Sequence, residues 1–199
     1  MDDETTIIDG NTRTERIKKF FFQNKKILAI ISSVILIIVI GFLLFEEFKK
    51  RNNIKLANEF NSSIINYTLD KKEQTIKELT NIVYKKDTTY SPLALYFLLD
   101  NNLIDNRDKI NDLFDVLINK TNLEKEIKNL IIYKKALYNS DFIEENELIN
   151  ILNPIINSES IWKSHSLYLL AEYFYQKNQK QKAKEFFDEI IKLDNSNSD

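Results

Sequence analysis

Side chains able to carry out chemistry are sparse in this sequence. His165 is the only histidine among 199 residues, and there is no cysteine. Zinc–cysteine sites and thiol nucleophiles are therefore excluded. His165 lies on a predicted helix between Ser164 and Ser166. We expect it to be a surface or half-buried side chain rather than a metal ligand or a general base.

Charged residues form short clusters, and each cluster has a structural explanation. Glu144, Glu145 and Glu147 stand at a predicted helix start, where carboxylates complement the helix dipole. Two further clusters are expected to be solvated helix faces, namely Asp112 with Asp115 and Lys134 with Lys135. The sequence has no glycine-rich phosphate loop and no catalytic signature. We therefore predict no enzymatic activity, no catalytic, cofactor-binding or metal-binding residue, and no small-molecule substrate.

One region near the C-terminus is rich in aromatic residues. Its members are Trp162, Tyr168, Tyr173, Phe174, Tyr175, Phe186 and Phe187. Aromatic side chains are enriched at the centres of protein interfaces, so this region is a candidate recognition surface. Helices that stack on one another also need aromatic residues to fill their contacts. We favour core packing for most of these side chains and keep the recognition surface as the alternative.

The composition indicates an all-α protein. Only two glycines and two prolines occur, and 43% of the residues are hydrophobic, which is enough to form a core. Residues 52–199 carry nineteen basic and twenty-three acidic side chains. A nucleic-acid-binding domain normally has a basic excess, so no nucleic-acid partner is expected.

The segment from Ile27 to Phe45 reads ILAIISSVILIIVIGFLLF and contains no charged residue. At about 1.5 Å per residue, its nineteen residues match a hydrocarbon core of about 30 Å. A cleavable signal peptide is the main alternative, but its apolar region is usually about 7 to 15 residues and ends in small side chains. Here the run ends at Phe45-Glu46-Glu47-Phe48. We predict a single transmembrane helix that stays in the lipid bilayer, with Ile27 and Phe45 at its ends.

The flanking charges predict an orientation. Six Lys or Arg residues precede the span closely and four follow it. By the positive-inside rule, residues 1–26 form a cytoplasmic tail and residues 46–199 lie outside the cytoplasm, in the periplasm if the membrane is a bacterial inner membrane. Lys49-Lys50-Arg51 is interpreted as an interfacial anchor, with a lipid-binding patch as the alternative.

Beyond the span, apolar residues recur at helical spacing. The pattern predicts eight helices in four pairs, at about 54–69 with 71–86, 92–103 with a helix opened by Asn106, 123–139 with 144–152, and 160–177 with 180–193. The pairs repeat about every 32 to 37 residues, close to the 34 residues of a tetratricopeptide repeat (TPR). We expect residues 52–199 alone to be soluble and mainly helical, because every apolar stripe has a helical partner.

Local signals define some of these helices more closely. Ser91 is predicted to be an N-cap, with Pro92 at the first helical position. Pro154 is predicted to end or kink its helix, or to allow continuation to Ile156. The helix at 123–139 carries an apolar stripe of Ile127, Leu130, Ile131 and Leu137, together with Lys134.

The final pair fits the packing positions of a TPR. The predicted packing residues are Leu167, Leu170, Ala171 and Phe174 on its first helix and Ala183, Phe187 and Ile190 on its second. Small residues at Ala171 and Ala183 would let the two helices approach closely. Lys182 is expected on the solvated side. The predicted fold is a TPR-like α-solenoid of about four helical hairpins, with a generic helical bundle as the alternative.

This layout resembles the YfgM-like family of ancillary SecYEG translocon subunits. The residues that carry the resemblance are Arg16 to Phe48, Tyr90-Ser91-Pro92-Leu93-Ala94-Leu95, and Trp162 to Ile191. The resemblance implies association with the Sec translocon and with a periplasmic chaperone or folding factor. It carries over no catalytic residue.

Two other functions stay open at this point. One is a TPR scaffold for the assembly of another membrane complex. The other is a cytoplasmic receptor for targeting signals, if the charge bias at the span is misleading.

Overall fold

The computed structural model describes the backbone of residues 4–196 and the side chains of residues 14–193. Within the described backbone the regular elements are all helical, so the predicted all-α class is confirmed. The elements are α1 (Glu4–Gln23), α2 (Lys25–Ile65), the short 3-10 helix η1 (Leu69–Lys71), α3 (Lys72–Tyr84), α4 (Tyr90–Asp100), α5 (Arg107–Lys120), α6 (Lys125–Asn139), α7 (Glu145–Ile156), α8 (Lys163–Gln176) and α9 (Lys180–Ser196).

The chain divides into two compact units, Met1–Lys55 and Leu56–Asp199. The division falls within α2, which contains the predicted span and also much of the helix expected at 54–69. No proline or glycine separates Phe45 from Ile54, and Arg51 Nε lies 2.7 Å from Glu47 Oε1 one turn away. A helical backbone therefore continues where the sequence pattern suggested two elements.

In the first unit, α2 is a helix long and apolar enough to cross a membrane. Its apolar side chains are exposed over the predicted span, for example Ile37 at 68% and Leu44 at 67%. Burying such a surface in lipid is strongly favourable, whereas leaving it in water is not.

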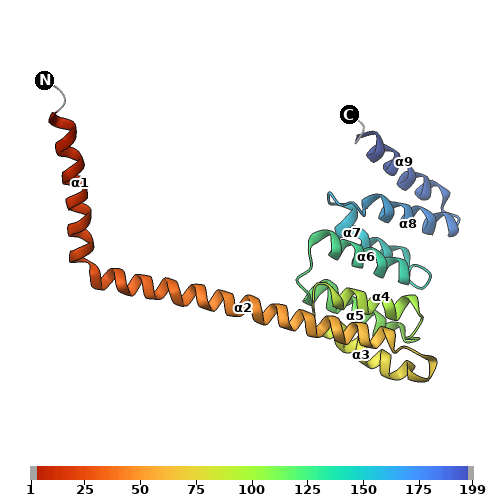
Figure 1. Cartoon of the computed structure of the whole chain (residues 1–199). Helices are drawn as coiled ribbons and strands as arrows, with labels where there is room; N and C mark the ends of the chain where they lie inside the picture. The colour runs from red at the N-terminus through yellow and green to blue at the C-terminus, as the bar shows by residue number, and fades with distance from the viewer. Residues whose placement is uncertain (1–3, 197–199) are drawn as a thin grey trace. The chain divides into compact units, whose positions relative to one another are not determined.

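In the second unit, consecutive helices pack on one another from α3 through α9 (Figure 1). The most extensive packing joins α8 to α9, α3 to α4, and α6 to α7. Further contacts join α7 to α8, α5 to α6 and α3 to α5, whereas α4 packs less on α5 than on α3. Each hairpin therefore covers the apolar face of its neighbour.

Two clusters of buried apolar side chains form the core of this unit. The first is centred on Leu79, Leu95 and Phe114, and the second on Leu152, Leu170 and Phe174. All six side chains are at most 1% exposed. On each helix the buried residues recur at three- and four-residue spacing, as Ile76, Leu79 and Ile82 do on α3, which is why each helix presents one apolar side to the stack.

Three helices end on residues with left-handed backbone conformations, and none of these residues is a glycine. Lys86, Asn102 and Asn178 have φ angles of 57°, 48° and 60°. After α8, the Asn178 N–H donates to the Tyr175 carbonyl and the Gln179 N–H to the Phe174 carbonyl. This pattern of two bonds closes the helix end and reverses the chain.

The start of α4 differs from the predicted N-cap. The helix begins at Tyr90, and Asp87 Oδ1 accepts from the backbone N–H groups of Thr89 and Tyr90. Ser91 is fully buried instead, and its hydroxyl accepts from Asp87 N at 2.9 Å and donates to the Ile82 carbonyl at 2.7 Å. The prediction of Ser91 as N-cap, with Pro92 at the first helical position, was therefore wrong. The N-cap position is Thr89, whose side chain makes no capping bond, and the Asp87 carboxylate binds the first N–H groups instead.

Two other local predictions can be compared with the structure. The side chain of Asn106 caps α5 by accepting from Lys109 N at 2.9 Å, as expected for an N-cap. Pro154 lies inside α7, which continues to Ile156. The continuation is therefore the correct alternative.

Candidate protein-interaction surface

A groove between α4 and α6 is the best candidate for a binding surface. Its volume is about 510 Å³. Its lining consists of Thr88, Thr89, Pro92, Leu93, Tyr96, Asn122, Leu123, Glu124, Ile127 and Leu130. We call it the α4/α6 groove. Leu93 is 41% exposed and Ile127 is 40% exposed, so apolar surface is accessible in it.

Two turns build the ends of this groove. Thr88 and Thr89 belong to the turn fixed by Asp87 and by the buried hydroxyl of Ser91. On the other side, the Thr121 hydroxyl donates to the Val116 carbonyl at 3.0 Å and so fixes the turn between α5 and α6. The turns that join the hairpins therefore also position the groove.

Tyr96 gives the groove its most distinctive polar group. Its hydroxyl is enclosed and has no hydrogen-bond partner in the described part of the chain. Burial, with a smaller contribution from Asp100, raises the pKa of Tyr96 to about 12. The phenol therefore stays neutral at physiological pH and is able to donate a hydrogen bond. Lys134 Nζ lies 4.7 Å from the centre of the Tyr96 ring, within cation–π distance.

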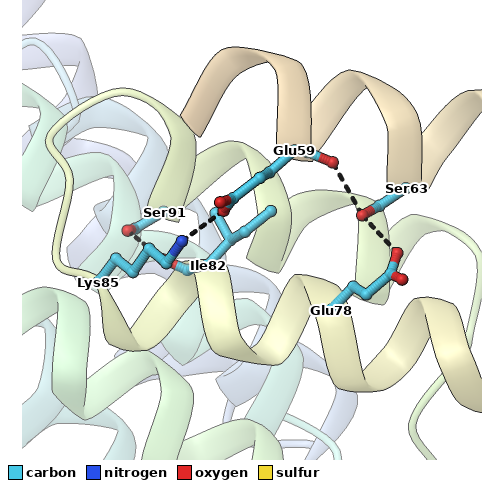
Figure 2. A network of polar contacts seen from close by, with 6 residues as sticks. All are labelled: Glu59, Ser63, Glu78, Ile82, Lys85 and Ser91. Atoms are coloured by element: carbon cyan, nitrogen blue, oxygen red, sulfur yellow. Dashed lines mark hydrogen bonds and ion pairs between the residues drawn. The ribbon is translucent and has the colours of Figure 1, made fainter. Parts of the chain in front are cut away.

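A second cavity, of about 460 Å³, lies between the end of α2 and α3, and all but one of its eight lining residues are polar or charged. Figure 2 shows that its side chains bind one another: Lys85 pairs with Glu59, and the Ser63 hydroxyl donates to Glu78 Oε2 at 2.7 Å. A hydrogen bond from Gln74, together with the bond from Ser63, lowers the pKa of the Glu78 carboxyl. These contacts join α2 to α3. We therefore assign this cavity a structural role, and the α4/α6 groove stays the candidate binding surface.

His165 is exposed, which agrees with the first of its two predicted placements, at the surface or half-buried. Its ring lies 5.4 Å from that of Trp162 and 6.1 Å from that of Tyr133, while Tyr133 and Trp162 stack at 5.9 Å. No group of three or more His, Asp or Glu side chains able to hold a metal ion occurs among the described residues. The surroundings of His165 are thus aromatic.

Two of the charged residues expected on solvated faces form an ion pair between helices. Lys135 Nζ lies 2.8 Å from Asp115 Oδ1, and the Lys135 side chain is only 18% exposed. The expectation of a solvated face was therefore wrong for Lys135, whereas 47% of the Asp115 side chain is exposed. Sequence periodicity could not indicate this ion pair, because the partners lie on different helices twenty positions apart.

Glu145 also joins separate elements. It lies in the first turn of α7, where its charge complements the helix dipole. It accepts from Gln179 Nε2 at 2.9 Å and from Lys182 Nζ at 3.1 Å. These bonds, that of Gln179 foremost, lower the pKa of Glu145. Lys182 lies 5.0 Å from the centre of the Phe174 ring as well, so it is not the purely solvated residue that we expected.

The aromatic region divides between core and surface. Tyr173 and Phe174 are buried, and the Tyr173 hydroxyl donates to the Ile143 carbonyl at 2.9 Å. Tyr168 and Tyr175 are 50% and 60% exposed. The remaining members, Trp162, Phe186 and Phe187, are half-buried. The region is therefore not one continuous recognition surface.

The residues predicted to pack the final hairpin lie as follows. Leu167, Leu170, Ala171, Phe174 and Ala183 are at most 1% exposed, and Phe187 and Ile190 are half-buried.

On α6 the residues of the predicted apolar stripe lie on two sides of the helix. Ile131 is buried, whereas Ile127 and Leu137 are 40% and 49% exposed. The predicted stripe therefore included Ile127, which lines the α4/α6 groove, although we expected the whole stripe to be covered by a neighbouring helix.

Comparisons of the sequence with protein-family models, curated proteins and solved structures gave no match. The geometry of the groove and the character of α2 therefore carry the functional argument. The resemblance to YfgM-like proteins stays a prediction based on Arg16–Phe48, Tyr90–Leu95 and Trp162–Ile191.

Proposed function

We propose that this protein is a membrane-anchored protein–protein interaction module. The observation that carries this proposal is the α4/α6 groove, in which Leu93 and Ile127 present apolar surface between adjacent hairpins. Accessible apolar grooves rimmed by polar groups are typical of surfaces that bind other proteins. The segment Ile27–Phe45 holds the module at a bilayer.

We further propose that residues 56–196 form a TPR-like solenoid. The packing of successive helices on their neighbours and the repeat of about 32 to 37 residues support this fold. The buried small residues Ala171 and Ala183 support it for the final hairpin. In such a solenoid, neighbouring hairpins together form a binding surface that none of them has alone.

The groove is suited to an apolar peptide segment. Its volume of about 510 Å³ is enough for a few aliphatic side chains. The Tyr96 side chain adds an aromatic residue to the lining, and its hydroxyl is enclosed. Unfolded or extended polypeptides supply such apolar side chains.

The resemblance and the flanking charges suggest which partners to test. With the N-terminus in the cytoplasm and the helical unit in the periplasm of a bacterial inner membrane, the proposed partners are the Sec translocon and a periplasmic chaperone. The module would link the two as an ancillary subunit, without enzymatic activity. A scaffold for another membrane complex is the alternative function, and a cytoplasmic receptor is the third.

A photo-crosslinking amino acid at Leu93 tests this function in cells. The same probe at Lys184, an exposed position on α9, is the control. We expect specific products at Leu93 that contain Sec subunits or a chaperone, identified by mass spectrometry, and that disappear in Ile127→Asp. Products with a different complex would favour the scaffold, and no excess over Lys184 would contradict a binding role for the groove.

A further inference from the structure

The segment that precedes the apolar part of α2 is rich in basic side chains that form no ion pair with another described residue. Its five described basic residues are Arg16, Lys18, Lys19, Lys25 and Lys26, and all are exposed. None of them forms an ion pair within the described part of the chain. Glu15 is the single acid between positions 13 and 45. This segment is therefore strongly positive.

Apolar side chains accompany these cations at helical spacing. Ile17, Phe20 and Phe21 follow the i, i+3, i+4 pattern on α1, and each is 57% exposed. Phe22 is 79% exposed, and Lys25 Nζ lies 5.8 Å from the centre of its ring. Basic residues beside exposed aromatic and aliphatic ones are the pattern of helices that lie at a lipid interface.

The other flank of the apolar segment has a different charge pattern. Lys49, Lys50, Arg51 and Lys55 share it with Glu46 and Glu47. Arg51 is paired with Glu47 at 2.7 Å, which neutralises part of its positive charge. The two flanks therefore differ in free cationic charge, and only the first one combines that charge with a run of phenylalanines.

We propose that residues 16–26 bind the headgroups of anionic phospholipids, with Ile17, Phe20 and Phe21 inserted at the interface. This inference rests on the membrane anchoring proposed above. The helical assignment is interrupted at Asn24, between the end of α1 at Gln23 and the start of α2 at Lys25. Arg16, Lys18 and Lys19 thus lie on a helix separate from α2, whereas Lys25 and Lys26 begin the helix that carries the span. Anionic headgroups match the charge of the segment, and the acyl-chain boundary matches its apolar side chains.

The full chain in lipid nanodiscs provides the test. Because Trp162 is the only tryptophan, Ile17→Trp combined with Trp162→Phe places a single fluorophore in the segment. Its quenching by lipids brominated in the acyl chains is compared between discs of phosphatidylcholine and discs that also contain phosphatidylglycerol. We expect quenching about two-fold stronger or more in the anionic discs. Raising the salt from about 0.1 M to about 1 M should reduce the difference, because the Debye length shortens.

Matched charge variants separate this binding from general attraction to the disc. Arg16→Gln with Lys18→Gln and Lys19→Gln should remove the difference between the two discs. The control Lys49→Gln with Lys50→Gln and Lys55→Gln should keep it. Equal quenching in both discs, or equal losses in both triple variants, would overturn the proposal. Failure of the chain to co-elute with either disc would instead contradict the anchoring itself.

Discussion

The hydroxyl of Ser91 lies between the end of α3 and the start of α4, where it joins the Asp87 N–H to the Ile82 carbonyl. It accepts from Asp87 N and donates to the Ile82 carbonyl, and Ser91 is fully buried. At the other two left-handed helix ends, the backbone itself closes the second bond, as between Leu103 N and the Leu98 carbonyl. At the end of α3, the Ser91 hydroxyl thus takes the place of a direct hydrogen bond from the Asp87 N–H to the Ile82 carbonyl.

Ser91→Ala should therefore destabilise the helical unit. The change leaves the half-buried Asp87 N–H without its partner, while the Ile82 carbonyl keeps the bond from Lys85 N, and the expected cost is about 1 to 3 kcal/mol. Urea unfolding of residues 52–199 measures it. Thr88→Ala, at an exposed position of the same turn, should alter stability by about 0.5 kcal/mol or less. Equal midpoints for the two variants would show that the Ser91 bonds contribute nothing to stability.

Lys86→Gly should stabilise the same unit. Lys86 has a φ of 57°, a conformation that costs a non-glycine residue about 1 to 2 kcal/mol. Glycine also raises the conformational entropy of the unfolded chain, which offsets part of this gain. We therefore expect the free energy of unfolding to rise by up to about 1 kcal/mol. Lys86→Ala, which keeps the strained conformation, should be close to neutral. Asn178→Gly should gain less than Lys86→Gly, because asparagine tolerates this conformation better. A loss of stability in Lys86→Gly, measured by urea unfolding, would contradict the strain.

At the scale of the elements, Glu145 connects α7 to the turn before α9 and to α9 itself. Its pKa is lowered in the folded protein by its bonds to Gln179 and Lys182. The ionised carboxylate thus stabilises the fold above the ordinary pKa of a glutamate, and this contribution is lost as the pH falls through the lowered pKa.

The difference in stability between wild type and Glu145→Gln should therefore shrink on acidification. Urea unfolding at a series of values from about pH 6 to about pH 3 measures this difference. Glu147→Gln serves as the control, because Glu147 is an exposed acid in the same turn. A difference that stays constant across the range would mean that the Glu145 charge does not stabilise the fold.

The contact of α8 with α9 depends on small residues. Ala183 is 1% exposed, so Ala183→Leu should overpack the contact and cost about 1 to 3 kcal/mol. Lys184→Leu is the appropriate control, because Lys184 is exposed, whereas Lys182 binds Glu145 and contacts Phe174. Equal urea midpoints for Ala183→Leu and wild type would show that the final hairpin packs through another side.

The existence and order of the helices from α3 onward were predictable, because three- and four-residue apolar spacing is strong after Arg51, whereas α1 was not predicted and the helix expected at 54–69 is the continuation of α2. Three other features were not predictable. Helix ends at Lys86 and Asn178 use left-handed residues other than glycine, so the usual glycine signal is absent. The stripe on α6 did not reveal which of its apolar sides meets a neighbour. The α4/α6 groove is formed by residues about thirty positions apart, and no local pattern indicates such a pairing.

At the scale of the whole molecule, two kinds of apolar surface have different roles. In residues 56–196 the apolar side chains mostly cover one another, and a limited groove stays accessible. In the segment Ile27–Phe45 the apolar side chains are exposed all around the helix. A helix that is apolar on every side needs an apolar environment, and we propose that the lipid bilayer supplies it. The sequence predicted this helix from length and composition, while its orientation depends on a difference of two flanking charges.

The topology of the chain tests the central claim most directly. Two reporters are fused separately after Asp199. Alkaline phosphatase is active only outside the cytoplasm, whereas green fluorescent protein fluoresces in the cytoplasm and stays dark when it is exported in an unfolded state. The same fusions to a chain lacking residues 27–45 are the control. We predict an active phosphatase and a dark fluorescent protein for the intact chain, with the reverse for the control. A fluorescent, phosphatase-negative intact chain would place the helical unit in the cytoplasm and contradict the periplasmic interaction module.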